Sequence, residues 1–227
     1  MQMISLSMIR DFLRKNLSLI VFLVLVFALR WSFADQYLVP SGSMEPTLHV
    51  GDRILVNKMA YALKVPYTGL IISRTGEPVR GDIVVFENPR DQITMVKRLI
   101  GMPGDKLVID DGFVSINGEP IQGSVEGQKI FVQSDEPTVT YHERFGDKEV
   151  TIQRLPFMVR PQHFELQVPA DHYFAMGDNR DNSSDSRVWG FIPRDHLKGR
   201  AFAVFWSMRF EEWVPKVDWQ RTGHKLN

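Results

Sequence analysis

The 227-residue sequence contains no cysteine. This absence excludes disulfide bonds, thiolate metal sites and cysteine nucleophiles, although it does not identify the compartment in which the protein works. The chain also lacks an excess of charge of either sign, because 27 basic residues balance 27 acidic residues. A protein that binds nucleic acid normally carries a concentrated basic face, so we expect no nucleic-acid partner.

Several catalytic and metal-binding motifs are also missing. There is no G-x-S-x-G nucleophile elbow, because Gly42-Ser43 is followed by Met44. Neither S-x-x-K nor H-E-x-x-H occurs. A calcium loop that began at Asp181 would have Ser186 where glycine is needed. We therefore expect neither a metal nor another cofactor.

Apolar residues are concentrated near the N-terminus, where Ser18 is the only polar residue of the segment 17–29. Two interpretations compete. A cleaved secretory leader would use Ser32-Phe33-Ala34 as a small-x-small exit site. A membrane anchor would extend to Ala34, with Arg30 reaching toward the lipid headgroups. Either way, the three basic residues before the run orient the N-terminus toward the cytoplasm. These are Arg10, Arg14 and Lys15.

The rest of the chain has mainly β character. The turn signals Asp111-Gly112 and Asn117-Gly118 predict hairpins, and 58–64 is the one later segment with a helical period. The more polar stretch 123–167 indicates an inserted β subdomain. We expect strands over residues 83–86, 94–100, 106–109, 113–116, 173–176 and 201–206.

A serine and a lysine are candidates for catalysis. Ser43 lies on a stiff turn between Pro40 and Pro46, which is typical of a nucleophile but also of a proline-rich linker. Alternation along the strand 94–100 puts Lys97 on an apolar face. Desolvation would lower the pKa of this amine, so that it could accept a proton from a serine hydroxyl. Alternatively, the lysine extends into solvent from an edge strand.

A polar loop over residues 177–187 supplies a third group of candidates. Ser183 and Asp185 could orient a lysine amine, and Arg187 could form an ion pair with Asp185.

Four stretches, in this order behind an apolar run, resemble the bacterial type I signal peptidases, also called leader peptidases. They are Ser41-Gly42-Ser43-Met44 with Pro46-Thr47-Leu48, then residues 81–86, 97–105 and 177–187. The resemblance implies a membrane-bound serine endopeptidase that removes signal peptides from translocated precursor proteins. It would cut after small residues, in an Ala-x-Ala pattern, through a Ser/Lys dyad and an acyl-enzyme.

The resemblance also implies roles for individual residues. Ser43 matches the nucleophile and Lys97 the general base, while the Ser41 hydroxyl and the Ser43 backbone N–H match the oxyanion hole. Three further positions match residues that support the lysine: Ser183, Asp185 and Arg187. Substrates of the family bind as an added strand beside residues that correspond to 36–43 and 95–97. The apolar candidates for the substrate pockets are Val39, Met44, Leu48, Met95 and Val96.

The implied fold is an all-β catalytic core with an inserted second β subdomain, behind one N-terminal transmembrane helix. We expect a cytoplasmic N-terminus (1–16), a retained anchor (17–34), a core (35–110 and 168–227) and an insertion (111–167). The protein would then be a single-pass protein of the bacterial cytoplasmic (inner) membrane. Its catalytic domain would lie on the extracytoplasmic, periplasmic face, and its partners would be precursor proteins and the lipid bilayer.

Two alternatives stay open at this point. One is a self-cleaving Ser/Lys protein of the repressor type, although no DNA-binding module precedes the dyad. The other is a non-enzymatic, membrane-tethered β module that binds extended peptides.

Overall fold

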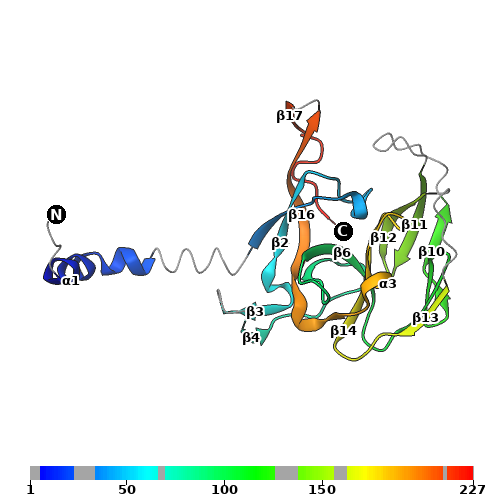
Figure 1. Ribbon diagram of the computed structural model, residues 1–227, viewed down its shortest axis with the longest axis horizontal. Coiled ribbons are helices and arrows are strands. Elements are labelled where there is room, and N and C mark those ends of the chain that lie inside the picture. Colours follow the sequence, from blue (N-terminus) through cyan, green and yellow to red (C-terminus); the bar gives the residue numbers. More distant parts are fainter. Residues whose placement is uncertain are drawn as a thin grey trace.

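The computed structural model describes residues 6–22, 34–65, 70–125, 138–155, 163–211 and 214–226. Beyond the helical N-terminal residues 6–22, which include α1 (Leu6–Lys15), the described elements are strands with a few single helical turns (Figure 1). The prediction of a mainly β protein is therefore confirmed.

The largest sheet has the strand order β1-β2-β16-β5-β6-β14-β15, and β17 pairs with the end of β16. A separate pair of short strands, β3 and β4, lies beside it. The strands of these two sheets are β1 (Ala34–Leu38), β2 (Asp52–Asn57), β3 (Ala62–Lys64), β4 (Ile71–Arg74), β5 (Ile83–Glu87), β6 (Thr94–Gly101), β14 (His172–Met176), β15 (Ile192–Pro193), β16 (Leu197–Glu211) and β17 (Val214–Val217).

Two smaller sheets lie between β6 and β14 in the sequence, with the orders β13-β7-β8-β9 and β10-β11-β12. Although β7 belongs to the segment expected in the core, it pairs with β8 and β13 and so lies in the second group of sheets. The strands are β7 (Lys106–Asp110), β8 (Phe113–Ile116), β9 (Glu119–Pro120), β10 (Gln122–Val125), β11 (Val139–Phe145), β12 (Lys148–Arg154) and β13 (His163–Gln167).

The two turns predicted from the sequence connect β7 to β8 and β8 to β9. Asp111 and Gly112 have φ of 46° and 80°, and Asn117 and Gly118 have φ of 54° and 88°. Two successive positive φ angles define the turn whose twist matches antiparallel strands, and Asn-Gly and Asp-Gly pairs favour it. The hairpin prediction is confirmed at both places.

The prediction of a helix over 58–64 is wrong. A single 3-10 turn, η2 (Lys58–Ala60), begins after Asn57, whose side chain accepts a hydrogen bond from Met59 N at 3.0 Å. The chain then enters β3, which pairs with β4. Cross-strand pairing therefore overrides a helical pattern that was only about two turns long.

The N-terminal segment is helical as far as it is described, since residues 17–22 follow α1 in the same conformation. Among the described residues, no helix is both long and apolar enough to cross a membrane. Residues 23–33 of the expected anchor lie outside the described part of the chain. Ala34, expected to end the anchor, is the first residue of β1 and pairs with Asn57.

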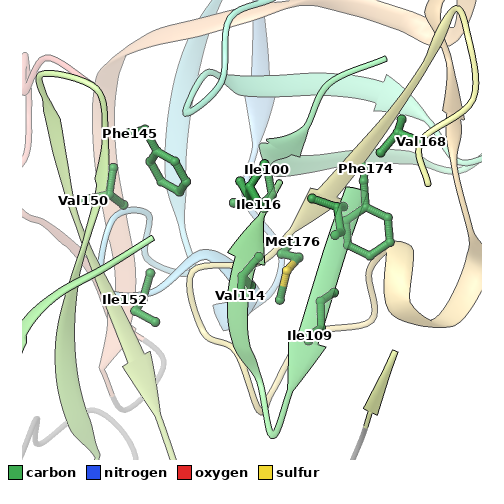
Figure 2. Packing of buried hydrophobic residues seen from close by; sticks show 11 residues of the cluster. Ile100, Ile109, Val114, Ile116, Phe145, Val150, Ile152, Val168, Phe174 and Met176 are labelled. Atoms are coloured by element: carbon green, nitrogen blue, oxygen red, sulfur yellow. The ribbon is translucent and has the colours of Figure 1, made fainter. Parts of the chain in front are cut away.

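One buried apolar cluster joins the inserted sheets to the main sheet (Figure 2). Ile100 of β6 and Met176 of β14 contribute from the main sheet, whereas Ile109 and Ile152 contribute from β7 and β12. All four side chains are almost completely buried. Burial of apolar surface favours association of the two parts, so the insertion packs on the strands that carry the candidate site.

The shared core leads to a stability prediction for Ile109→Ala. Ile109 is fully buried, so its truncation removes apolar contacts and leaves a cavity. We expect a loss of about 2–5 kcal/mol in the free energy of unfolding, measured by denaturant titration of the full chain in detergent. The control is Ile72→Ala, because Ile72 of β4 is 62% exposed and should change stability by less than about 0.5 kcal/mol. Equal losses in both variants would contradict the packing described here.

Candidate active site

Ser43 lies on a short turn directly after β1. The 3-10 turn η1 (Gly42–Met44) begins after Ser41, and the Met44 side chain packs into the main-sheet core. Ser43 itself is 9% exposed. The Ser41 hydroxyl lies 3.4 Å from the Ser43 hydroxyl, so both oxygens face the same space.

Lys97 approaches this turn from β6, where it pairs with Val84 of β5. Its strand neighbours Met95 and Leu99 both belong to one apolar cluster, as the alternation predicted. Lys97 is 4% exposed, and its Nζ donates a hydrogen bond to Ser43 Oγ at 2.6 Å. A second hydrogen bond, to the Val96 carbonyl, spans 3.2 Å. The structure therefore brings together a serine and a lysine that lie 54 positions apart.

Burial lowers the pKa of Lys97 below its ordinary value, because the charged ammonium loses its hydration. The nearby carboxylates of Asp185 and Asp178 act in the opposite direction, while Arg187 lowers the pKa further. An uncharged amine 2.6 Å from a hydroxyl can accept its proton. The arrangement is thus chemically capable of activating Ser43 as a nucleophile.

The loop 177–187 packs behind this pair. Asp185 is completely buried and caps the short helix α3 (Ser186–Trp189), and both of its oxygens bind the Arg187 guanidinium, at 2.8 and 2.7 Å. Asp185 also accepts a hydrogen bond from Gly177 N at 3.0 Å. The predicted pairing of Asp185 with Arg187 is therefore present. The buried hydroxyl of Ser183 has no hydrogen-bond partner within the described chain, so it is not bonded to Lys97.

Three residues that the sequence analysis left without a role also hold the turn. Asp178 binds Arg98 in a bidentate pair, at 2.8 and 2.7 Å, and accepts the Thr47 hydroxyl at 2.5 Å. Asn179 donates from its backbone to the Ser43 carbonyl, at 3.1 Å. Arg98 and Asp178 directly follow Lys97 and Gly177 in the quoted motifs, but nothing in the local pattern indicates that they meet.

A pocket of about 280 Å³ opens beside the Ser43 and Lys97 side chains. Met95 and Val96 line it, whereas Val39, Met44 and Leu48 lie beneath it in the main-sheet core and are almost completely buried. These three residues pack with residues of β2, β5 and β16 in that core and are not among the residues that line the pocket. The full lining is Tyr37, Leu38, Pro40, Ser41, Ser43, Ile54, Val85, Ile93, Thr94, Met95, Val96 and Lys97.

The described residues include no group of three or more His, Asp or Glu side chains that could hold a metal ion.

Comparisons with known proteins point to one family. The family model described as "Signal peptidase, peptidase S26" matches residues 12–206. Signal peptidase I of Pseudomonas fluorescens is 38% identical over 202 residues, which cover 83% of this chain and 69% of that protein. Signal peptidase I of Aquifex aeolicus is 33% identical over 241 residues, covering 90% and 88%. A crystal structure of a signal peptidase I from Enterococcus faecalis gives a TM-score of 0.36 at 27% identity, over 55% of this chain and 96% of that one.

The burial of Lys97 predicts a pH-dependent stability. In the unfolded chain its pKa returns to about 10.4. Between the lowered folded value and that value, the unfolded chain binds more protons, so the free energy of unfolding rises with pH. Lys97→Met removes this titration. We expect the variant to be more stable than the parent at pH 7 and this advantage to shrink toward pH 10, by about 1.4 kcal/mol for each unit of pKa lowering.

Denaturant titrations at both pH values measure this difference. Lys106→Met is the matched control, because Lys106 of β7 is exposed and the same substitution there should be independent of pH. If the gain in the free energy of unfolding of Lys97→Met over the parent were the same at pH 7 and pH 10, a lowered pKa of Lys97 would be contradicted.

Proposed function

This chain belongs to the signal peptidase family, peptidase S26, and from that premise we propose that it cleaves signal peptides from translocated precursors with a Ser43–Lys97 dyad. It is a serine peptidase that hydrolyses peptide bonds, as its relatives are. This family membership favours the enzyme over the non-enzymatic peptide-binding module. The observation that carries the dyad is the 2.6 Å separation of Lys97 Nζ and Ser43 Oγ in a buried environment.

In the acylation step, the neutral Lys97 amine takes the proton of the Ser43 hydroxyl while Oγ attacks the scissile carbonyl carbon. The Ser43 backbone N–H and the Ser41 hydroxyl donate to the oxyanion that forms. When the C–N bond breaks, the Lys97 ammonium returns its proton to the leaving amine, which is the new N-terminus of the mature protein. The signal peptide is then held as an ester on Ser43.

In deacylation, the same amine takes a proton from water, and the resulting hydroxide attacks the ester carbonyl. Collapse of the second tetrahedral intermediate releases the signal peptide, and Ser43 recovers its proton from Lys97. Asp185 and Arg187 support both steps by maintaining the charge balance near the amine, and Ser183 lines the back of the site beyond Gly177.

The substrate would bind as an added strand in the groove between β1 and β6. Within the described chain, residues 94–97 pair with β5 on one side only, because the pairing of β6 with β14 begins at Arg98. β1 pairs with β2 and has no second strand partner among the described strands. A pocket of about 280 Å³ lies between these edges and would receive side chains of the added strand, among them the small residues at positions −1 and −3.

We further infer that the N-terminal apolar segment before β1, which begins at residue 17, tethers the enzyme to the cytoplasmic membrane with its N-terminus inside. The described part, 17–22, is helical and exposes Leu17, Leu19 and Phe22. The basic residues that precede it match a cytoplasmic side. The catalytic core and the inserted sheets, which include β7, would then face the periplasm, where translocated precursors emerge.

Replacement of Ser43 by alanine tests the nucleophile. Detergent-solubilised full-length protein with added lipid is given a precursor peptide whose leader ends in Ala-x-Ala, and the products are identified by mass. We expect a single cut after the −1 alanine in the parent and a loss of roughly 10⁴-fold or more in kcat for Ser43→Ala. Ser73→Ala, at an exposed serine of β4, is the matched control and should cut normally. Equal cutting by the parent and Ser43→Ala would refute the dyad.

The pH dependence of kcat/KM tests the base. Only the uncharged amine can accept a proton, so activity should rise with pH through the pKa of Lys97 in the free enzyme. Because burial lowers that pKa, the midpoint of the rise should lie clearly below the value of about 10.4 for a free lysine. A rise centred at the ordinary lysine value would exclude Lys97 as a desolvated base.

A further inference from the structure

The inserted hairpin β11–β12 is bonded directly to the catalytic loop 177–187 through backbone groups. Gln153 of β12 donates to the Asp178 carbonyl at 2.9 Å and accepts from Arg180 N at 3.0 Å. These two bonds form a parallel bridge between Gln153 and Asn179. The loop is therefore continued as a short strand along the edge of the insertion.

A buried ion pair reinforces this backbone contact. Glu143 of β11 and Arg180 of the loop have side-chain exposures of 1% and 0%. Arg180 Nη1 donates to Glu143 Oε1 at 2.5 Å, and Nη2 donates to the second carboxylate oxygen. The remaining Nε–H of Arg180 donates to the Gly177 carbonyl at 3.2 Å. The guanidinium thus joins the insertion to the first residue of the loop.

A second pair fixes the same loop one residue further on. Asp181 accepts from Arg154 of β12 at 3.3 and 3.2 Å and from Leu155 N at 2.8 Å. The Arg154 guanidinium also lies 4.8 Å from the centre of the Phe113 ring of β8. Consecutive loop residues are therefore held by two neighbouring strands of the insertion.

The fixed loop residues contact Ser43 directly and are linked to Lys97 through the charges of Arg187 and Asp185. The backbone N–H of Asn179, between the two bridge bonds, donates to the Ser43 carbonyl at 3.1 Å. The Arg180 carbonyl accepts from Arg187 at 2.6 Å, and Arg187 binds Asp185, whose charge acts on Lys97. A displacement of Arg180 would thus be transmitted to both Ser43 and the surroundings of Lys97.

We propose that Glu143 is a positioning residue for catalysis: through Arg180 it holds the loop 177–187 against Ser43 and keeps Lys97 sealed from water. This inference rests on the proposed dyad and gives the insertion a role in it. A buried ion pair contributes little net stability compared with an apolar pair of similar volume, since desolvation offsets the attraction. Its contribution is directional, because a bidentate pair sets both the distance and the orientation of the loop.

The direction in which the acidic limb of the kcat/KM profile shifts distinguishes a positioning role of Glu143 from a simple effect of its charge. Removal of the Glu143 charge would, through space alone, make Lys97 easier to deprotonate and move the acidic limb of kcat/KM to lower pH. Loosening of the loop admits water to Lys97 and weakens its desolvation, which moves the limb to higher pH. A positioning role therefore predicts that the acidic limb of kcat/KM moves to higher pH, whereas loss of the charge alone would move it to lower pH.

The test compares Glu143→Gln with the parent in the precursor-peptide assay, with kcat normalised to folded protein by near-ultraviolet circular dichroism. We expect kcat to fall roughly 100-fold at pH 7, the acidic limb to move to higher pH, and KM to change little, because the substrate groove is formed by β1 and β6. Glu149→Gln is the matched control. Glu149 lies on β12 of the same hairpin but is exposed and pairs with His142 and Arg144.

Loss of stability alone could lower activity, so a second variant keeps the fold while it removes the pair. The double substitution Glu143→Met with Arg180→Met replaces the ions by apolar side chains, and we expect a melting temperature close to that of the parent. We still expect a reduced kcat and the shifted limb. A stable double variant with the parent's kcat and pH profile would overturn the inference, as would a Glu143→Gln variant that loses only stability.

Failure of the proposed function would look different. Ser43→Ala is assayed in the same series, and if it cut as fast as the parent, the dyad and the role of Glu143 in it would both be refuted. If Ser43→Ala is inactive while every Glu143 variant retains the parent's kcat and pH profile, the dyad stands and only the positioning role is lost.

Discussion

The protonation state of Lys97 depends on a competition between burial and two neighbouring carboxylates. Burial favours the neutral amine, whereas the charges of Asp185 and Asp178 favour the ammonium. Each carboxylate is bound by an arginine of its own, Arg187 for Asp185 and Arg98 for Asp178. These pairs neutralise most of the negative charge near the amine, so that desolvation dominates. The ion pairs around the site therefore favour the neutral form of Lys97 as well as the fold.

The position of the serine depends on the same pairs. The carboxylate that binds Arg98 also accepts the Thr47 hydroxyl, four residues after Ser43. The Thr47 carbonyl in turn accepts from Arg221, whose guanidinium binds the buried Asp52 of β2. The turn that carries Ser43 is consequently held at its far end by contacts with β6, β2 and the C-terminal segment. A turn held by three separate parts of the chain can keep its hydroxyl in place while substrates bind and leave.

Local sequence patterns are sufficient to predict the features that depend mainly on neighbouring residues. Period-two alternation predicts the strand 94–100 and the buried face of Lys97, and the Asp111-Gly112 pair predicts a hairpin because few other residues accept two positive φ angles. Local patterns do not indicate which strands build the pocket wall. Val39 and Met44 adjoin the candidate serine in sequence, yet they fill the core, and the wall is built partly from β2 and β5. Which strands meet across the groove is set by long-range pairing, which a local pattern does not encode.

The close approach of the loop 177–187 to the turn that carries Ser43 gives a physical reason for Gly177, the first residue of the loop. A Cβ atom at Gly177 would lie 2.3 Å from the Ser183 hydroxyl and 2.3 Å from the Ser43 carbonyl, closer than van der Waals contact permits. Any side chain there would push the loop away from the nucleophile turn. The Asn179 bond to the Ser43 carbonyl and the Gly177 bond to Asp185 would then be lost together. Close packing of the loop against the turn that carries Ser43 therefore requires a position without a side chain at residue 177.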